Sequence, residues 1–368
     1  MSDLKPINFT RGIPAVESFP IDDMIDAAAA ALKQHGSTLM QYGPSLGFAP
    51  LREWLAQQHR VEPNQVMLGN GSLQLLEFLS LLMIQPGDIV FTESPSYDRA
   101  ITLLKRRGAE VIGIPLESDG PDLDALEGQL HHHVPRFFYL VPDFQNPSGV
   151  TCSAEKRRRI IDLAERYNFL LVEDSPYRHL RYRGTDEPLL FRLAPHRVLL
   201  MSSFSKLISP GMRVGFVMGD HELLAKIAKI AEDTYITPNV LAHGIAYEWC
   251  RRGCMKPQIE KLKALYVPRL EACLAALEKH MPDAQAVRPE GGFFVSVILP
   301  PPAPSKWVRI AAARHQLNLA DGLAFFPDGG GEHFVRLPFC ALTPEEIDEG
   351  IQRLAMSVQE VSRQAETV

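Results

Sequence analysis

The chain has 368 residues, of which 46% are hydrophobic; this excludes a disordered polypeptide and provides enough apolar surface for two domains. The formal net charge is −6 and the Lys and Arg residues are dispersed, so nucleic acid is not an expected partner. The densest basic run, residues 156–159, is expected to form the exposed start of a helix.

The sequence also predicts a cytoplasmic protein. It contains no apolar segment of about 18 residues or more, and residues 1–6 lack the pattern of a signal peptide. Five cysteines at scattered spacings fit reduced thiols better than a disulfide framework. We therefore expect no membrane partner. We also expect no bound metal, because Cys250 and Cys254 have no further ligands at suitable spacing.

The N-terminal region is expected to be an extended arm followed by a helix. Residues 1–20 contain Gly and Pro residues that oppose a helix, whereas residues 21–35 are rich in Ala. A Gly/Pro turn at residues 42–47 then leads into a second helix with apolar residues at helical spacing.

From residue 66 onward, short apolar runs alternate with longer helical patterns. This alternation predicts an α/β domain whose mostly parallel sheet is covered by helices on both faces. In such a domain, ligand-binding side chains gather at the carboxyl ends of the strands. The expected strands are residues 66–68, 89–91, 111–114, 137–141, 169–172, 198–201 and 214–217, and the main helices between them are 73–84, 97–107, 122–130 and 154–167.

Beyond about residue 235 the pattern changes to long helices and then to a smaller α+β unit. We predict a large domain at residues 41–270 and a small domain at residues 271–368, which residues 1–40 join from the other end of the chain. Gly329-Gly330-Gly331 forms either a mobile lid or an ordinary hairpin connection. The expected elements of this region are helices 239–252, 256–280 and 305–316 and strands 293–299 and 334–337.

The most informative stretch follows the predicted strand 198–201. Ser203 and Ser205 precede Lys206, a Pro-Gly turn follows it, and Arg213 comes after the turn. Hydroxyls and a guanidinium suit a phosphate group, while a lysine without a salt-bridge partner can attack a carbonyl. A solvated loop lysine is the ordinary alternative.

This stretch resembles the lysine segment of the pyridoxal-phosphate (PLP) aminotransferases of fold type I, in the branch that contains aminoadipate and kynurenine aminotransferases. The resemblance covers nearly the whole chain. It implies PLP as the cofactor, held on Lys206 as a Schiff base. It also implies a homodimer with shared active sites, in which Tyr42 reaches the neighbour's cofactor phosphate.

A second phosphate-binding feature is expected at Gly71, Ser72 and Leu73, which precede an apolar helix. Glycine lets backbone N–H groups approach an anion, and a helix N-terminus carries partial positive charge. Such residues are often only a helix cap, but the matching residues of the resembling family bind the cofactor phosphate.

The resemblance implies cofactor contacts for four further residues near the ends of predicted strands. Asp174 ends strand 169–172, where a buried carboxylate needs a cationic partner such as a protonated pyridine nitrogen. Tyr97 is expected to lie on the face of the pyridine ring. Asn146, in an Asn-Pro-x-Gly sequence, and Tyr177 are expected to donate hydrogen bonds to the oxygen on that ring.

The substrate is expected between the predicted strand 334–337 and the N-terminal arm. Arg336 lies in an apolar strand, where its planar guanidinium suits a substrate α-carboxylate or, alternatively, an internal salt bridge. Asn146, Gly12 and Arg11 complete the expected substrate pocket. Arg11 is a candidate for a distal substrate carboxylate, although it can instead pair with a local acid.

These features predict an aminotransferase that moves the amino group of an L-amino acid to a 2-oxo acid by a ping-pong mechanism. Lys206, Asp174 and Tyr97 are the expected catalytic residues, with Lys206 as the general base at the substrate Cα. A PLP lyase, cyclase or oxidase is the first alternative, because a fold does not fix its chemistry. A regulatory binding module is the second, although residues 1–40 are too short and insufficiently basic for a DNA-binding domain.

Overall fold

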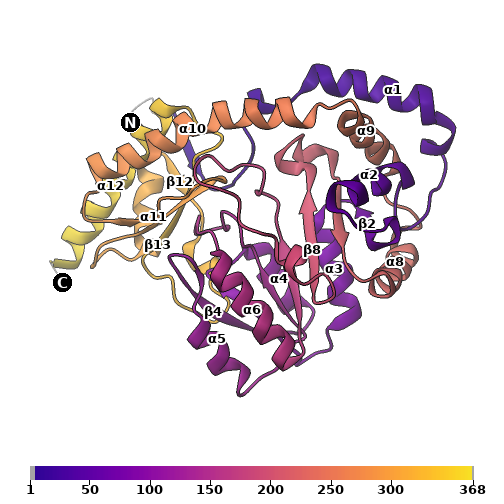
Figure 1. Ribbon diagram of the computed structural model, residues 1–368. Coiled ribbons are helices and arrows are strands. Elements are labelled where there is room, and N and C mark those ends of the chain that lie inside the picture. The colour runs from indigo at the N-terminus through magenta and orange to yellow at the C-terminus, as the bar shows by residue number, and fades with distance from the viewer. Residues whose placement is uncertain (1–4, 367–368) are drawn as a thin grey trace.

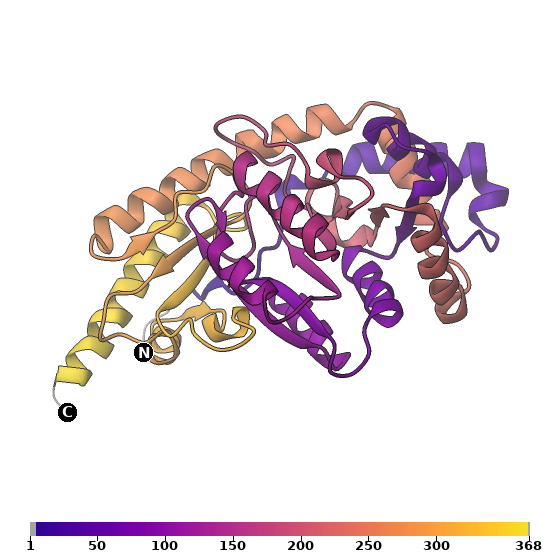
Figure 2. The same ribbon diagram turned by 60° about the horizontal axis from the view of Figure 1, so that its bottom comes forward.

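The computed structural model describes residues 5–366, which form two parts connected along one long helix, α10 (Met255–His280) (Figure 1). The larger part contains the main sheet. The smaller part contains the C-terminal strands and helices, coloured from orange to yellow (Figure 2). Apart from Tyr42, the site residues selected from the sequence belong to segments that meet between these two parts.

Within the described residues, the largest sheet has eight strands in the order β2-β9-β8-β7-β6-β3-β4-β5. The five strands from β8 to β4 run parallel, whereas β2, β9 and β5 pair with their neighbours in antiparallel fashion. The prediction of a mostly parallel sheet is confirmed. The strands are β2 (Val66–Gly69), β3 (Ile89–Ser94), β4 (Glu110–Glu117), β5 (Gly120–Pro121), β6 (Phe137–Leu140), β7 (Leu170–Asp174), β8 (Val198–Ser203) and β9 (Gly215–Met218).

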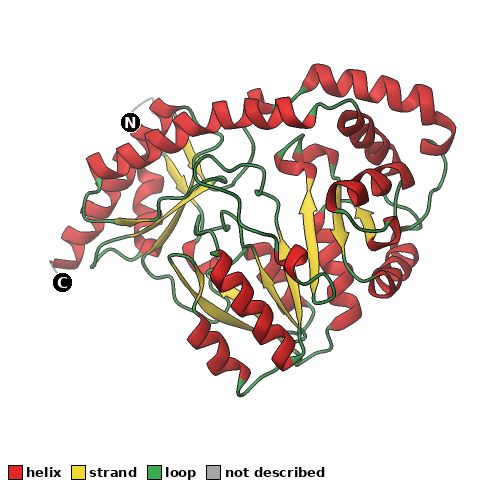
Figure 3. Ribbon diagram, in the orientation of Figure 1, coloured by secondary structure: helices red, strands yellow, loops and turns green. Residues whose placement is uncertain are grey.

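Helices cover both faces of this sheet (Figure 3). Alternate residues of β6 show the reason: Phe137 and Tyr139 pack into one hydrophobic core, and Phe138 and Leu140 into another. The helices α3, α4 and α8 contribute to the first core, and α2, α5, α6, α7 and α9 to the second. Their bounds are α2 (Ala49–His59), α3 (Ser72–Met83), α4 (Asp98–Arg106), α5 (Leu123–Leu130), α6 (Ala154–Tyr167), α7 (Leu190–Leu193), α8 (His221–Tyr235) and α9 (Val240–Arg251).

The smaller part contains two further sheets. In one, β11 (Phe294–Ile298) lies between β10 (Gln285–Ala286) and β13 (Phe334–Pro338), and both pairings are antiparallel. In the other, β1 (Ile7–Phe9) pairs in parallel with β12 (Leu317–Leu319). The helices of this part are α11 (Ser305–Arg314) and α12 (Pro344–Glu366). Short 3₁₀ turns occur along the whole described chain, at η1 (Val16–Ser18), η2 (Pro63–Gln65), η3 (Phe204–Lys206), η4 (Pro210–Met212) and η5 (Gly322–Phe325).

The N-terminal residues divide their contacts between the two parts. β1 pairs with β12 of the smaller part, whereas the helix α1 (Ile21–Leu39) packs against α9 of the larger part. The proposed domain boundaries at residues 40 and 270 stay a prediction. The Gly329–Gly331 segment connects η5 to β13, and just before it Asp328 accepts a hydrogen bond from the backbone of Gly113 in β4.

One expectation about the surface is wrong. The basic run at residues 156–159 does begin a helix, but the Arg157 side chain is fully buried rather than exposed. Its guanidinium donates to the Asp143 carboxylate at 2.7 Å and to the Pro142 carbonyl at 3.0 Å. These contacts balance its charge inside the protein and hold the loop between β6 and α6.

No helix in the described part of the chain combines the length and the apolar composition needed to cross a bilayer. All five cysteines carry free thiols, as the sequence predicts. Among residues 5–366, no group of His, Cys, Asp and Glu side chains is arranged to hold a metal ion.

Candidate active site

A cavity of ≈ 550 Å³ lies where the carboxyl ends of the parallel strands face the smaller part and the N-terminal arm. Tyr42 is not among its lining residues: its side chain is 72% exposed in the loop between α1 and α2. The other residues selected from the sequence line the cavity, namely Arg11, Gly12, Gly71, Ser72, Leu73, Tyr97, Asn146, Asp174, Tyr177, Ser203, Ser205, Lys206, Arg213 and Arg336.

Lys206 enters the cavity from η3, directly after β8. Its Nζ donates to the carbonyl oxygen of Gly12 at 2.9 Å and lies over the rings of Tyr177 and Phe293. No carboxylate in residues 5–366 forms an ion pair with it. The pKa of Lys206 is lowered to about 8, mainly by burial and also by the nearby Arg336 and Arg213 guanidiniums, whereas Cys340 and Asp174 oppose the shift. A larger fraction of the amine is therefore neutral and nucleophilic near neutral pH.

Asp174 ends β7 and presents one oxygen without a protein partner to this cavity. Its Oδ2 accepts a hydrogen bond from the Tyr139 hydroxyl at 2.7 Å, whereas Oδ1 is buried and unpaired within the described residues. Burial raises the pKa of Asp174 to about 6, although the Tyr139 hydrogen bond and the Lys206 charge both oppose the shift. A buried, unpaired carboxylate oxygen is costly unless a ligand donates to it.

A cradle for an anion forms where α3 begins. Gly71 precedes α3 with φ +101°, and a Cβ atom at this position would stand 2.3 Å from Nη2 of Arg213. Only glycine therefore lets the Arg213 guanidinium lie beside the helix N-terminus. Ser203 and Ser205, whose hydroxyls are 2.7 Å apart, line the same cavity. Hydroxyls, a guanidinium and helix N–H groups together suit a phosphate.

Arg336 lies in β13 with its guanidinium between the rings of Phe294 and Phe325. It donates to Oδ1 of Asn146 at 2.9 Å and to the Thr10 carbonyl at 2.7 Å, while its Nε is buried without a partner. Burial lowers the pKa of Arg336 from its ordinary value. No acid within residues 5–366 pairs with this guanidinium, so the alternative of an internal salt bridge is not observed.

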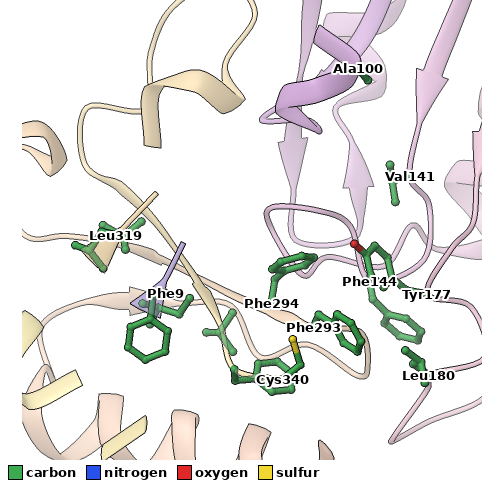
Figure 4. Close-up of a cluster of buried hydrophobic side chains, with 14 of the residues drawn as sticks. Phe9, Ala100, Val141, Phe144, Tyr177, Leu180, Phe293, Phe294, Leu319 and Cys340 are labelled. Atoms are coloured by element: carbon green, nitrogen blue, oxygen red, sulfur yellow. The ribbon is translucent and has the colours of Figure 1, made fainter. Parts of the chain in front are cut away.

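Aromatic side chains form one side of the cavity. Tyr177 contacts both Phe293 and Phe294, with ring centroids 5.6 Å apart in each case, and Figure 4 shows these three rings close together. The two phenylalanines come from the smaller part and the tyrosine from the larger part, so this contact joins the two. Burial raises the pKa of Tyr97 to about 12 and that of Tyr177 well above its ordinary value, which keeps both hydroxyls protonated as donors.

Sequence reasoning missed several side chains of this site. Tyr139 was assigned only to a strand, yet a tyrosine inside a buried strand needs a partner for its hydroxyl, and this signal could have led to Asp174. Phe294 and Phe325, which enclose Arg336, and Thr10, which accepts from it, were not selected either.

Known proteins share both the sequence and the fold of this chain. The family model described as aminotransferase class I and II matches residues 5–354. The chain belongs to the class I and II aminotransferases. A 2-aminoadipate transaminase of Thermus thermophilus is 34% identical over 96% of this chain and 90% of its own length. An aromatic-amino-acid aminotransferase of Thermococcus litoralis is 33% identical over 96% of this chain and 88% of its own length.

A crystal structure closely matches the fold of this aminotransferase. It is that of an alpha-aminoadipate aminotransferase from Thermus thermophilus, complexed with N-(5'-phosphopyridoxyl)-L-leucine. The TM-score is 0.93, the sequence identity is 33%, and the match covers 98% of this chain and 93% of the other. The predicted fold class, the PLP fold type I, is thereby confirmed, as are the cofactor PLP and the transfer of amino groups from amino acids to 2-oxo acids.

The residues of the cavity fit PLP. The unpaired Asp174 Oδ1 provides an acceptor for a protonated pyridine nitrogen, and the cradle at Gly71 and Arg213 provides donors for a phosphate. The Lys206 amine opens into the same cavity from the end of β8. The aminotransferase thus offers a partner for each of the three reactive features of the cofactor.

Proposed function

We propose that Lys206 is the residue through which this aminotransferase holds its cofactor and moves the substrate proton. One observation carries the assignment: the half-buried Lys206 amine has no acid partner in the described residues and shares a cavity with an unpaired Asp174 oxygen. Bound PLP supplies an aldehyde that condenses with amines and a ring that accepts the electron pair released at the substrate Cα. The displaced Lys206 amine takes the proton from Cα as a general base.

Asp174 supports this proton transfer by accepting a hydrogen bond from the cofactor's ring nitrogen. A negative carboxylate at this place keeps that nitrogen protonated, and the proton draws electrons into the ring. Tyr139 holds Asp174 in position and favours its ionised form through the hydrogen bond to Oδ2. We assign Tyr139 as a positioning residue for this reason.

The other residues that line the cavity would complete the cofactor contacts. Tyr97 would stack on the face of the ring, and Tyr177 would donate its hydroxyl to the oxygen on the ring. Asn146 would give its amide NH₂ to the same oxygen, because its Oδ1 already accepts from Arg336. The phosphate would be held by Gly71, Ser72, Leu73, Ser203, Ser205 and Arg213.

Arg336 binds the substrate α-carboxylate. Its guanidinium is held in place by two aromatic rings and by Thr10 and Asn146, so little rotational freedom is lost when it forms two hydrogen bonds. Gly12 lies against Phe294, where a Cβ would approach a ring carbon to 2.3 Å, and this close packing forms the wall beside the substrate. The names of the two relatives make 2-aminoadipate and aromatic amino acids the first donors to examine.

The reaction type is tested with the holoenzyme and a panel of amino acids in the absence of any oxo acid. Transamination predicts pyridoxamine phosphate in an amount stoichiometric with the enzyme, followed by recovery of the aldehyde form when a 2-oxo acid is added. Catalytic turnover of the amino acid without an acceptor would instead support a lyase, cyclase or oxidase, and no conversion of the cofactor would refute the assignment.

We propose further that the aminotransferase is a homodimer. Ile21, Ile25 and Leu32 share one face of α1 and are 60%, 61% and 47% exposed, an apolar stripe that a monomer would leave in water. Tyr42 at 72% and Met40 at 74% exposed follow at the end of the same helix. Burial of this surface by a second copy would place Tyr42 near the partner's cofactor phosphate.

Complementation between two inactive variants tests this arrangement. Lys206→Ala and Tyr42→Ala subunits, mixed under conditions that exchange subunits, form heterodimers with one complete site if Tyr42 acts across the interface. The mixture should then recover more activity than either variant alone. No recovery in heterodimers isolated by two different tags would place Tyr42 outside the partner's site. A cytoplasmic location and the absence of a nucleic-acid partner stay predictions.

A further inference from the structure

Arg11 occupies a constrained position between the two cations that contact the substrate. The carbonyl of the preceding residue, Thr10, accepts from Nη2 of Arg336 at 2.7 Å, and the carbonyl of the following residue, Gly12, accepts from Nζ of Lys206 at 2.9 Å. In the proposed function Arg336 binds the substrate α-carboxylate and Lys206 takes the proton from Cα. The backbone on both sides of residue 11 is therefore held by Lys206 and Arg336, and Arg11 is one of the residues that line the cavity.

The arm that carries Arg11 has little freedom to move away. The Ile13 carbonyl accepts from the Cys340 thiol at 3.0 Å, and Gly12 packs so closely on Phe294 that a Cβ atom there would overlap the ring. The arm is thus anchored to β13 and its neighbours on both sides of Arg11. A long, flexible side chain on a fixed backbone can reach different parts of the cavity without moving the catalytic groups.

The charge of Arg11 is not balanced by the protein. Within residues 5–366, no carboxylate forms an ion pair or hydrogen bond with its guanidinium, so the alternative of pairing with a local acid is not observed. Arg99, another arginine that lines the cavity, lies 3.7 Å from the Asp98 carboxylate. Asp321 of the cavity wall lies 3.7 Å from Arg309. Arg11 is therefore the cation left for an anionic substrate side chain.

We propose that Arg11 binds the side-chain carboxylate of a dicarboxylic amino donor and of the corresponding 2-oxo acid acceptor. The expected class is glutamate and 2-oxoglutarate, together with 2-aminoadipate as the longer homologue. A guanidinium and a carboxylate form charge-assisted, often bidentate hydrogen bonds, and a neutral side chain of the same shape cannot form them. This inference rests on the proposed function, because it requires Lys206 and Arg336 to orient the substrate.

The test compares two isosteric donors, L-glutamate and L-glutamine, in the single half-reaction with holoenzyme, read by cofactor absorbance. Arg11→Gln should lower kcat/KM for glutamate about 10- to 100-fold and change that for glutamine less than about 3-fold. Arg11→Lys keeps the charge but loses the planar guanidinium that can form two parallel hydrogen bonds. It should lower kcat/KM for glutamate by an intermediate factor. Arg99→Gln is the matched control, since it removes the same charge from the same cavity. It should leave the ratio of kcat/KM for glutamate to kcat/KM for glutamine unchanged.

Three results would overturn the inference and leave the proposed function intact. They are an equal loss for both donors in Arg11→Gln, a loss of preference in Arg99→Gln instead, and a normal enzyme that does not distinguish glutamate from glutamine. Failure of the normal enzyme to convert its cofactor with any amino acid would refute the proposed function itself. Added salt gives an independent readout: it should weaken glutamate binding in the normal enzyme more than in Arg11→Gln, because the guanidinium is solvent-accessible.

Discussion

Tyr139 donates a 2.7 Å hydrogen bond to Asp174 Oδ2 and leaves Oδ1 as a buried acceptor without a protein partner. The two residues lie on adjacent parallel strands, where Tyr139 is in register with Val172, two residues before Asp174. This pair divides one carboxylate into a structural oxygen and a ligand-binding oxygen. The site depends on this division, because the same group must be fixed in place and remain available to the cofactor.

Tyr139→Phe should impair catalysis without removing the cofactor. The Tyr139 hydrogen bond lowers the pKa of Asp174, so its loss raises that pKa and reduces the fraction of ionised Asp174 near neutral pH. We expect kcat to fall about 10-fold at pH 7 and the acidic limb of the pH–rate profile to move to higher pH. A variant with normal kcat and an unshifted profile would show that Tyr139 only fills space.

Asp174→Asn should stabilise the cofactor-free protein above pH 6 while it abolishes most of the activity. The pKa of Asp174 is raised to about 6 by burial, so the folded state disfavours the charged form. Below about pH 4 the carboxyl is protonated in both the folded and the unfolded chain, so the folded protein does not bear the cost of burying a charged carboxylate. As the pH rises from 4 to 6, ionisation of Asp174 in the unfolded chain lowers the free energy of unfolding of the normal protein by up to about 3 kcal/mol.

Thermal unfolding of the cofactor-free normal protein and the Asp174→Asn variant at pH 4 and pH 7.5 measures this effect. The variant should have the higher midpoint at pH 7.5, and the difference should shrink at pH 4. Added PLP should then stabilise the normal protein more than the variant. Equal midpoints at both pH values would mean that the carboxylate is solvated in the cofactor-free state.

The Lys206 amine should titrate below the ordinary range of lysine in the cofactor-free protein. Burial lowers its pKa to about 8, so the neutral amine becomes the major form as the pH rises through 8. Competitive labelling with acetic anhydride between pH 6 and 11, quantified on the Lys206 peptide, should give a midpoint near 8. The exposed Lys256 serves as the internal reference, and coincident curves for the two lysines would contradict the prediction.

Arg336→Lys should weaken amino acid binding while the cofactor stays bound. The substitution keeps the charge but removes the planar fork that lies between Phe294 and Phe325. We expect the KM for amino donors to rise about 10- to 100-fold, with normal cofactor content by absorbance. An unchanged KM would assign the α-carboxylate to another residue.

The strands of the main sheet could be predicted because they are short apolar runs that are buried on both faces. β6 and β8 are buried along nearly their whole length, so their sequences carry a strong signal. The residues that follow these strands then had to lie at one edge of the sheet, and the resemblance to the PLP aminotransferases singled out Asn146, Asp174 and Lys206 among them.

Other features depend on contacts between segments far apart in sequence. β1 has three residues and pairs with β12, which lies some 310 residues further along the chain, and no short motif specifies such a pairing. The basic run at residues 156–159 indicated solvent, because its local pattern does not reveal that Asp143 lies next to Arg157 in the interior. Tyr139 was hidden for the same reason, since its partner is on a neighbouring strand.

The most direct test of the central assignment is borohydride reduction of PLP-loaded enzyme, followed by peptide mass spectrometry. The account predicts one phosphopyridoxyl group per chain, attached to the Lys206 side chain, and none when an excess of amino acid substrate has first converted the cofactor. A modification on a different lysine, or an unmodified Lys206 peptide in a protein that absorbs as the holoenzyme, would contradict it.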